Sequence, residues 1–408
     1  MRISTSWQYQ QSVTTMLNQQ SSLATTQNQV TTGKRINVAS DDPVGAAQVL
    51  SLNHILDSNA QYTTNINAAN TRLTTEGGAL DSVTSLLDRA RTLALGGVNG
   101  TLSPTDRQNM ATELSQIRDQ LVQLANTTDN YGSAIFAGTS TTTVPFAKAA
   151  DGSVTYNGND GQLTTAVGSS LQIAIGDAGD GIFMNLPAGN GSFVASAGSG
   201  NTGTMIVGDS SVTDTNTWNA AKLSTGGAIN ITFGNGGTWT ATDASGNAIL
   251  DSSGNPVTGS YSDGGNVSFD GFSIGLSGTP SAGDTISVQT NQSQDIFSAF
   301  NNVISALGGG DSDTQLANTI NRQLETIDQT QNAVTNTQVK IGNRLNTLDQ
   351  QSTAYADLNV TYTSALQSVQ DVDPYTAISN LSLQSSALQA SQQVFAQMKT
   401  MTLFNYLK

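Results

Sequence analysis

Apolar and amide side chains recur at helical spacing over the first 30 residues of the chain. The positions on this stripe are Val13, Met16, Gln20, Leu23, Gln27 and Val30. Steps of three and four residues place them on one narrow seam of a helix, as in a coiled coil. The stripe ends before Gly33, a residue that permits a break in the helix. The pattern therefore predicts a helix ending near Thr32.

Two later segments carry the chemistry that begins a helix. Asp42-Pro43 and Ser103-Pro104 each pair a capping side chain with a proline suited to the first helical turn. Apolar residues follow both starts at near-heptad spacing, namely Ile66, Ala69, Leu73, Leu80, Val83, Leu87 and Ala90, then Met110, Leu114, Ile117, Leu121 and Leu124. Three helices are thus predicted before the middle of the chain.

The longest periodic run lies near the C-terminus, from Leu316 to Val369. A helix of about 55 residues would be about 80 Å long, which is the length of a rod and not of a small globular core. Gln331 and Gln338 occupy seam positions, where they either fix the register of a coiled coil or leave a solvated gap. Asp373-Pro374 ends the run. A last helix is predicted beyond it.

The middle of the chain has a different pattern. Short apolar runs at 171–175, 229–233 and 267–269 are bounded by Gly, Asn or Asp, which is typical of antiparallel strands joined by tight turns. The segment at 243–247 recurs at 251–255 as a second turn signal. The middle is therefore predicted to be a β domain.

These patterns predict a multidomain α and β protein. Its fold is a long antiparallel helical rod, a coiled-coil bundle built from both termini, with an inserted Gly-rich antiparallel β domain. The expected segments are a coiled-coil-forming N-terminus, the N-terminal half of the rod, a β-rich outer domain of one or two lobes, the C-terminal half of the rod, and a coiled-coil-forming C-terminus, at 1–42, 43–144, 145–290, 291–373 and 374–408.

Both terminal helices carry a narrow apolar stripe with no partner close in sequence. Such a stripe either frays in water or finds another helix. We expect the two termini to pair within and between subunits, although part of the set could be ordinary core within one chain. The candidate assembly residues are Ile3, Val13, Met16, Leu23, Val30, Leu381, Leu388, Phe395, Met398 and Leu403.

The charge balance argues against several partners. The net charge is -15, from 15 Lys and Arg against 30 Asp and Glu. An acidic surface of this kind repels phosphate backbones and anionic lipid, so nucleic acid is not an expected partner. No window has the ~20 apolar residues that a membrane span needs, and we expect no membrane insertion. The first eight residues lack the apolar core of a signal peptide, so export would need another route.

The residue types that carry most catalytic chemistry are missing. The chain has no cysteine and one histidine, His54, which we expect to be a partly exposed helix residue. Cys–His pairs and thiolate or multi-histidine metal sites are thereby excluded, and a Ser–His–Asp triad would have to use His54. We expect no enzyme activity and no cofactor. The Asp residues of the middle domain are scattered and favour solvated turns over a calcium site. A surface adhesin acting through this domain is a lesser alternative.

Several segments are similar to a known family. Residues 1–5, 32–37 (Thr-Gly-Lys-Arg-Ile-Asn) and 40–43 (Ser-Asp-Asp-Pro) resemble the N-terminal region of the flagellin family. Segments at 100–107, 117–121, 124–126, 135–138, 283–285, 294–297 and 388–404 resemble the hook-associated members at the hook–filament junction more than filament flagellin. The resemblance covers roughly residues 1–145 and 280–408.

The resemblance implies a structural subunit of the bacterial flagellum. Such a subunit is secreted unfolded through the flagellar type III pathway, with an export chaperone holding its C-terminal helix. It would then form a ring-like homo-oligomer outside the cell, at the hook–filament junction. Its neighbours would be hook-associated protein 1 and flagellin. Filament flagellin itself is the alternative within the family.

Overall fold

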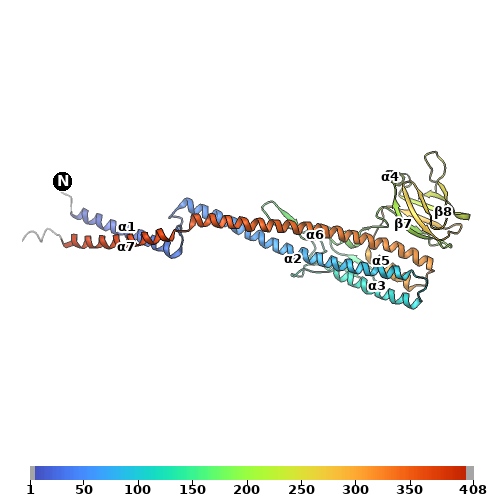
Figure 1. The fold of residues 1–408 in the computed structure, drawn as a ribbon, viewed down its shortest axis with the longest axis horizontal. Helices are drawn as coiled ribbons and strands as arrows, with labels where there is room; N and C mark the ends of the chain where they lie inside the picture. The colour runs from blue at the N-terminus through green and yellow to red at the C-terminus, as the bar shows by residue number, and fades with distance from the viewer. Residues whose placement is uncertain (1–4, 401–408) are drawn as a thin grey trace, which may run out of the picture. The chain divides into compact units, whose positions relative to one another are not determined.

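The computed structural model describes residues 5–400. The chain divides into two compact units, one formed by residues 1–66 with 349–408 and the other by residues 67–348. Long helices come from both ends of the chain, and a middle antiparallel β domain lies between them in sequence, as predicted (Figure 1). The long helices are α1 (Thr5–Thr32), α2 (Pro43–Gly97), α3 (Pro104–Ala125), α6 (Asp313–Gln370) and α7 (Pro374–Thr400).

The predicted helix starts are confirmed by their caps. Oδ1 of Asp42 accepts a hydrogen bond from the backbone N–H of Gly45 at 2.9 Å, at the start of α2. Ser103 and Asp106 form a reciprocal capping box at the start of α3. Oδ1 of Asp373 accepts from the backbone N–H of Tyr375 at 3.1 Å, at the start of α7. These short polar side chains satisfy N–H groups that the helix itself leaves free.

The glutamines in the long seam hold the register of α2 and α6. In the unit of residues 67–348, Gln331 donates to Asp88 at 2.5 Å, and Gln338 donates to Asp81 at 2.7 Å. The partners move back by seven residues on α2 as α6 advances by seven. This fits two antiparallel helices and supports the register interpretation over the solvated gap.

Two shorter helices were not predicted. Helix α5 (Ile296–Gly308) is capped by Asp295, which accepts from the backbone N–H of Ser298 at 2.7 Å. Helix α4 (Thr215–Ser224) is capped by Asp214 and lies in the middle domain, where only strands and turns were expected. The expectation was wrong at α4 because a ten-residue helix with only Trp218 and Ala221 buried gives a weak periodic signal.

All strand pairs of the described residues are antiparallel. Two sheets, of order β10-β9-β8-β13-β6 and β11-β12-β7, enclose an aromatic core that includes Phe193, Trp218, Trp239 and Phe272. Their strands are β6 (Val194–Ala197), β7 (Ile206–Val212), β8 (Ala228–Phe233), β9 (Thr238–Asp243), β10 (Thr258–Ser260), β11 (Asn266–Phe269), β12 (Phe272–Ser277) and β13 (Thr285–Gln289). We call residues 188–292 the outer lobe.

Three small ribbons complete the sheet structure. Strands β1 (Phe146–Lys148) and β2 (Val154–Tyr156) form one, and β3 (Thr164–Ala166) and β4 (Gln172–Ala174) form another. Strands β5 (Leu186–Pro187) and β14 (Ser293–Gln294) pair where the chain enters and leaves the outer lobe. We call this last pair the neck.

The repeated Asp segments of the outer lobe are turns. Oδ1 of Asp243 accepts from the backbone N–H groups of Ser245 and Asn247, at 2.8 and 2.9 Å. Asp251 makes the same two bonds one repeat later. The backbone N–H groups hold the pKa of Asp251 below its ordinary value. The carboxylates therefore serve the turns, as the sequence pattern favoured.

A buried polar cluster lies where α2 and α6 meet the loop after β4. Glu76 is fully buried, and its Oε1 accepts from the backbone N–H of Asp177 at 3.1 Å. The Asp177 carboxylate receives both guanidinium nitrogens of Arg344, at 2.6 and 3.0 Å. Oε2 of Glu76 has no hydrogen-bond partner. Burial, followed by the charge of Asp177, raises the pKa of Glu76 to about 8, against the opposing charges of Arg344 and Arg72.

Candidate assembly surface

Helices α1 and α7 lie side by side and run in opposite directions (Figure 1). The rings of Tyr9 and Phe395 pack with their centroids 5.0 Å apart. Oγ of Ser12 donates to the sulfur of Met398 at 3.9 Å. The termini therefore meet within one chain, and we call α1 and α7 the terminal helix pair.

The predicted terminal residues share the seam of this pair. All eight that fall in the described residues are half-buried, and none is fully buried, namely Val13, Met16, Leu23, Val30, Leu381, Leu388, Phe395 and Met398. Ile3 and Leu403 lie outside the described residues. Two helices bury only one side of a narrow stripe, which explains why burial stays partial.

Two other positions of the predicted N-terminal stripe were wrong. Gln20 and Gln27 are exposed, whereas Gln19 is half-buried and Thr26 is 7% exposed. The seam therefore passes one residue earlier at both places. Adjacent polar residues of similar character gave no signal for choosing between the two faces.

The terminal helix pair is almost free of charge. Helix α1 has no Asp, Glu, Lys or Arg in its 28 residues, and the only one in the 27 residues of α7 is Lys399. Helices that face water usually carry charged side chains opposite their apolar stripe. The exposed residues of this pair are instead Gln, Asn, Ser, Thr and apolar residues, so covering its outer face would desolvate little charge.

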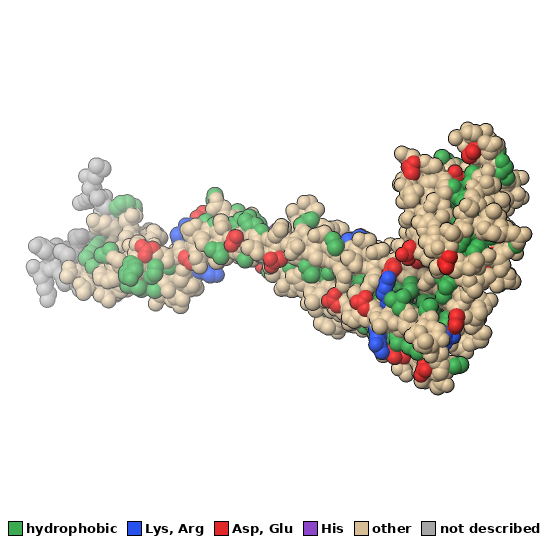
Figure 2. All heavy atoms as spheres, turned by 45° about the vertical axis from the view of Figure 1, so that its right-hand side comes forward, with side chains coloured by type: hydrophobic (Ala, Val, Ile, Leu, Met, Phe, Trp, Pro, Cys, Tyr) green, Lys and Arg blue, Asp and Glu red, His purple; other side chains and the backbone are tan. Residues whose placement is uncertain are grey.

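Helix α7 carries a second apolar stripe that sequence reasoning missed. Leu383, Ala387, Ala390 and Val394 follow steps of four, three and four residues, and all four are exposed. Leu383 is 67% exposed and Val394 is 56% exposed. A second heptad count, offset from the first, would have found this stripe. Figure 2 shows the apolar side chains that reach the surface of the terminal helix pair.

The seam of the pair also contains unsatisfied amides. Oε1 of Gln19 and Oε1 of Gln384 are buried without a hydrogen-bond partner. A buried acceptor left in this state costs about 1–3 kcal/mol. Each of these two amide oxygens therefore weakens the seam.

A compact joint, residues 33–42 with 371–373, connects the terminal helix pair to the adjoining ends of α2 and α6 in the same unit. The guanidinium of Arg35 donates to the carbonyl oxygen of Val369 at 2.7 Å and pairs with Asp42 at 3.1 Å. The backbone N–H of Val372 donates to the carbonyl oxygen of Gly33 at 3.0 Å. Hydrogen bonds from the backbone N–H of Gly45 and then from Arg35 hold the pKa of Asp42 below its ordinary value. Arg35 thus links the last turn of α6 to the cap of α2.

Other classes of site find little support. Among residues 5–400, no group of three or more His, Cys, Asp or Glu side chains is placed to hold a metal ion. No helix in that range is long and apolar enough to cross a membrane. His54 lies exposed on α2, as predicted. The terminal helix pair and its joint are therefore the best candidate for a functional surface.

Comparison with known proteins gives this architecture of helical ends around a β domain a family. The profile of the bacterial flagellin N-terminal helical region matches residues 3–141, and that of the C-terminal helical region matches residues 324–407. Together these ranges exceed half of the chain. The chain belongs to the flagellin family.

Within the family, the chain is similar to hook-associated proteins and, over shorter stretches, to flagellins. Flagellar hook-associated protein 3 of Salmonella typhimurium is 38% identical over 186 residues, which are 46% of this chain and 58% of that protein. The chain thus spans little more than half the length of this curated relative.

Two crystal structures are similar over more of the chain. FlgL of Xanthomonas campestris is 30% identical with a TM-score of 0.65, over 77% of this chain and 99% of that one. The flagellar junction protein FlgL of Legionella pneumophila is 29% identical with a TM-score of 0.68, over 79% of this chain and 100% of that one.

Proposed function

We propose that this chain is the structural subunit that joins the hook of the bacterial flagellum to its filament. In this role it acts as an adaptor between hook-associated protein 1 on one side and flagellin on the other. It assembles as a ring-like homo-oligomer outside the cell. Similarity to hook-associated protein 3 and to a flagellar junction protein supports this position over that of filament flagellin.

The observation that carries the proposal is the exposed stripe of α7. Leu383 and Val394 are more than half exposed, with two exposed alanines spaced between them as in a coiled coil. Alanines at such positions let a second helix approach closely. A stripe of this kind on an almost uncharged helix is suited to a partner of the same uncharged character, which a second copy of the chain provides.

The stripe and the seam have different roles in this proposal. Half-buried residues such as Leu388 and Phe395 join α7 to α1, whereas Leu383 and Val394 face a neighbouring subunit. The unsatisfied amides of Gln19 and Gln384 weaken the pair, which favours completion by further helices. Before assembly, the same exposed stripe would need cover, and an export chaperone bound to α7 supplies it.

Assembly of the purified chain separates the junction role from that of filament flagellin. The chain is mixed with short flagellin filaments from the same bacterium, and electron microscopy with a gold-labelled antibody records where it binds. A junction subunit is expected to label filament ends and to form no long filament alone. Growth of long filaments from the chain alone would show that it is a flagellin. If the chain neither labels filament ends nor grows into filaments, the proposal is contradicted.

A further inference from the structure

The outer lobe is joined to the helices of its unit in two different ways. The first is covalent, because the chain enters and leaves through the neck. Strands β5 and β14 pair there, and the backbone N–H of Ala188 donates to the carbonyl oxygen of Gln292 at 3.0 Å. Two adjacent strands restrain a lobe without fixing its orientation, since both can bend together.

The second connection is a row of amide side chains on α6. Oδ1 of Asn318 accepts from the backbone N–H of Val207 at 2.7 Å, and its Nδ2 donates to the carbonyl oxygen of Met205 at 3.0 Å. Nδ2 of Asn321 donates to the carbonyl oxygen of Val207 at 3.0 Å. Strand β7 is the edge of its sheet, so these amides occupy the place of a neighbouring strand.

The outer lobe keeps its hydrophobic core to itself. The buried residues that form this core run from Phe193 to Val288 and include none from α6. The core therefore does not bind the lobe to the helix. The contacts between the lobe and α6 include the hydrogen bonds of the Asn318 and Asn321 side chains. Nε2 of Gln329 also donates to the carbonyl oxygen of Gly189 at 3.3 Å. Polar contacts of this kind exchange readily with water.

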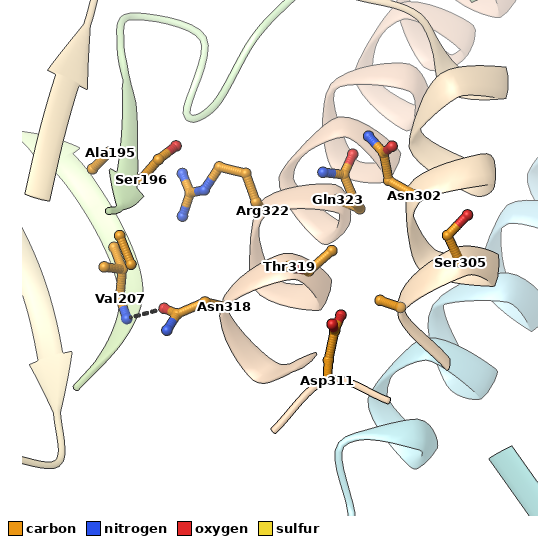
Figure 3. A pocket seen from close by; sticks show the side chains of 12 residues that line it. Ala195, Ser196, Val207, Asn302, Ser305, Asp311, Asn318, Thr319, Arg322 and Gln323 are labelled. Carbon is orange, nitrogen blue, oxygen red and sulfur yellow. Dashed lines mark hydrogen bonds between the residues drawn. The ribbon is translucent and has the colours of Figure 1, made fainter. Parts of the chain in front are cut away.

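A polar cleft of about 530 Å³ lies beside the amide row. In Figure 3, Asn318 and Arg322 of α6 point toward Val207 and Ser196 of the lobe. Water that enters such a cleft can compete for the hydrogen bonds of the Asn318 and Asn321 side chains.

Two carboxylates of like charge, Glu325 on α6 and Asp209 on β7, lie close to the same contact. Burial and the nearby carboxylate of Asp209 on β7 raise the pKa of Glu325 on α6, against the opposing effect of Arg322. Arg322 pairs with Glu325 at 2.5 Å and offsets this repulsion. The interface thus contains both attraction and a built-in opposing element.

We infer that Asn318 and Asn321 form a releasable latch that positions the outer lobe on α6. While the latch is closed, the amides complete the edge of β7 and the lobe has one orientation. When it opens, water replaces the amides and the lobe pivots at the neck without losing its own core. Asn318 and Asn321 are therefore positioning residues for the lobe.

Distance measurement between spin labels tests the latch. The chain has no cysteine, so cysteines introduced at Leu223 in the lobe and Thr335 on α6 can be labelled alone. Both positions are exposed. Double electron–electron resonance is expected to give one narrow distance distribution in the parent chain. The Asn318→Ala/Asn321→Ala variant is expected to give a broad one, and exchange of the Val207 amide is expected to quicken about tenfold.

The control is the substitution of another asparagine on α6 that lies outside the latch. Asn332→Ala alters an exposed residue and is expected to leave the distribution narrow. Tryptophan emission from the lobe core reports that the lobe stays folded. Should the double variant disturb the core, Asn318→Asp decides, because it keeps the acceptor for the Val207 N–H and replaces the donor to Met205 with a charged oxygen that the Met205 carbonyl repels. A narrow, unshifted distribution in the latch variants would overturn the inference.

Discussion

The fully buried Glu76 makes the stability of its unit depend on pH. Its pKa is raised to about 8 in the folded chain, against an ordinary value of 4.5. Between these values, the folded state holds a proton that the unfolded state has released. Stability therefore falls as pH rises through this window and levels off above the folded-state pKa. The direction is opposite to that of an acid held ionised by a salt bridge.

The size of the effect follows from the two pKa values. Each tenfold change in proton affinity corresponds to about 1.4 kcal/mol, so the free energy of unfolding should fall on the order of 4 kcal/mol between about pH 5 and about pH 9. Glu76→Gln removes this contribution, and its amide oxygen can still accept from the Asp177 N–H. The variant should match the parent near pH 5 and exceed it increasingly toward pH 9.

Urea unfolding followed by circular dichroism at several pH values measures this difference. Glu113→Gln is the matched control, because Glu113 is 41% exposed and pairs with Arg89 at 2.7 Å on the surface. The difference in free energy of unfolding between this control and the parent should stay nearly constant across the pH range. If the curves of Glu76→Gln and the parent run parallel from about pH 5 to about pH 9, then Glu76 does not hold its proton in the folded state and the reasoning is refuted.

Two further substitutions test the joint and a helix cap. Arg35→Ala removes the link between the last turn of α6 and Asp42, so hydrogen exchange of the Val372 amide should quicken about tenfold. Unchanged exchange would show that Arg35 does not hold the joint. Ser103→Ala removes the capping box of α3 and should lower the free energy of unfolding, measured in urea, by about 1 kcal/mol. The control Thr105→Ala, in the same turn, should lower it much less. Equal losses would show that the Ser103 cap does not stabilise the helix.

The elements that could be predicted are those encoded locally. Asp42, Ser103 and Asp373 each stand before a proline and cap the helix that follows, so their chemistry needs no distant partner. The seam of α7 was found because Leu388 and Phe395 are apolar against a polar background. On α1 the seam shifted where glutamine and threonine could face either side.

The features that could not be predicted depend on distant contacts. Glu76 meets Asp177 across 101 residues, and Arg344 meets Asp177 across 167. Nothing near Glu76 in the sequence distinguishes it from a solvated helix residue. The same holds for Asn318, whose amide reads as an ordinary exposed position until β7 is placed beside it. Such groups become recognisable only when the chain is folded.

One matched pair of variants tests the proposal that the exposed stripe of α7 joins subunits. Leu383→Lys places a charge on the stripe, whereas Leu223→Lys does the same at an 87% exposed leucine of the outer lobe. Each variant replaces the natural chain in its bacterium, and filaments attached to cells are counted by electron microscopy. We expect Leu383→Lys to lose attached filaments and to release flagellin into the medium, and Leu223→Lys to have no effect. Normal filaments with Leu383→Lys would contradict the proposal.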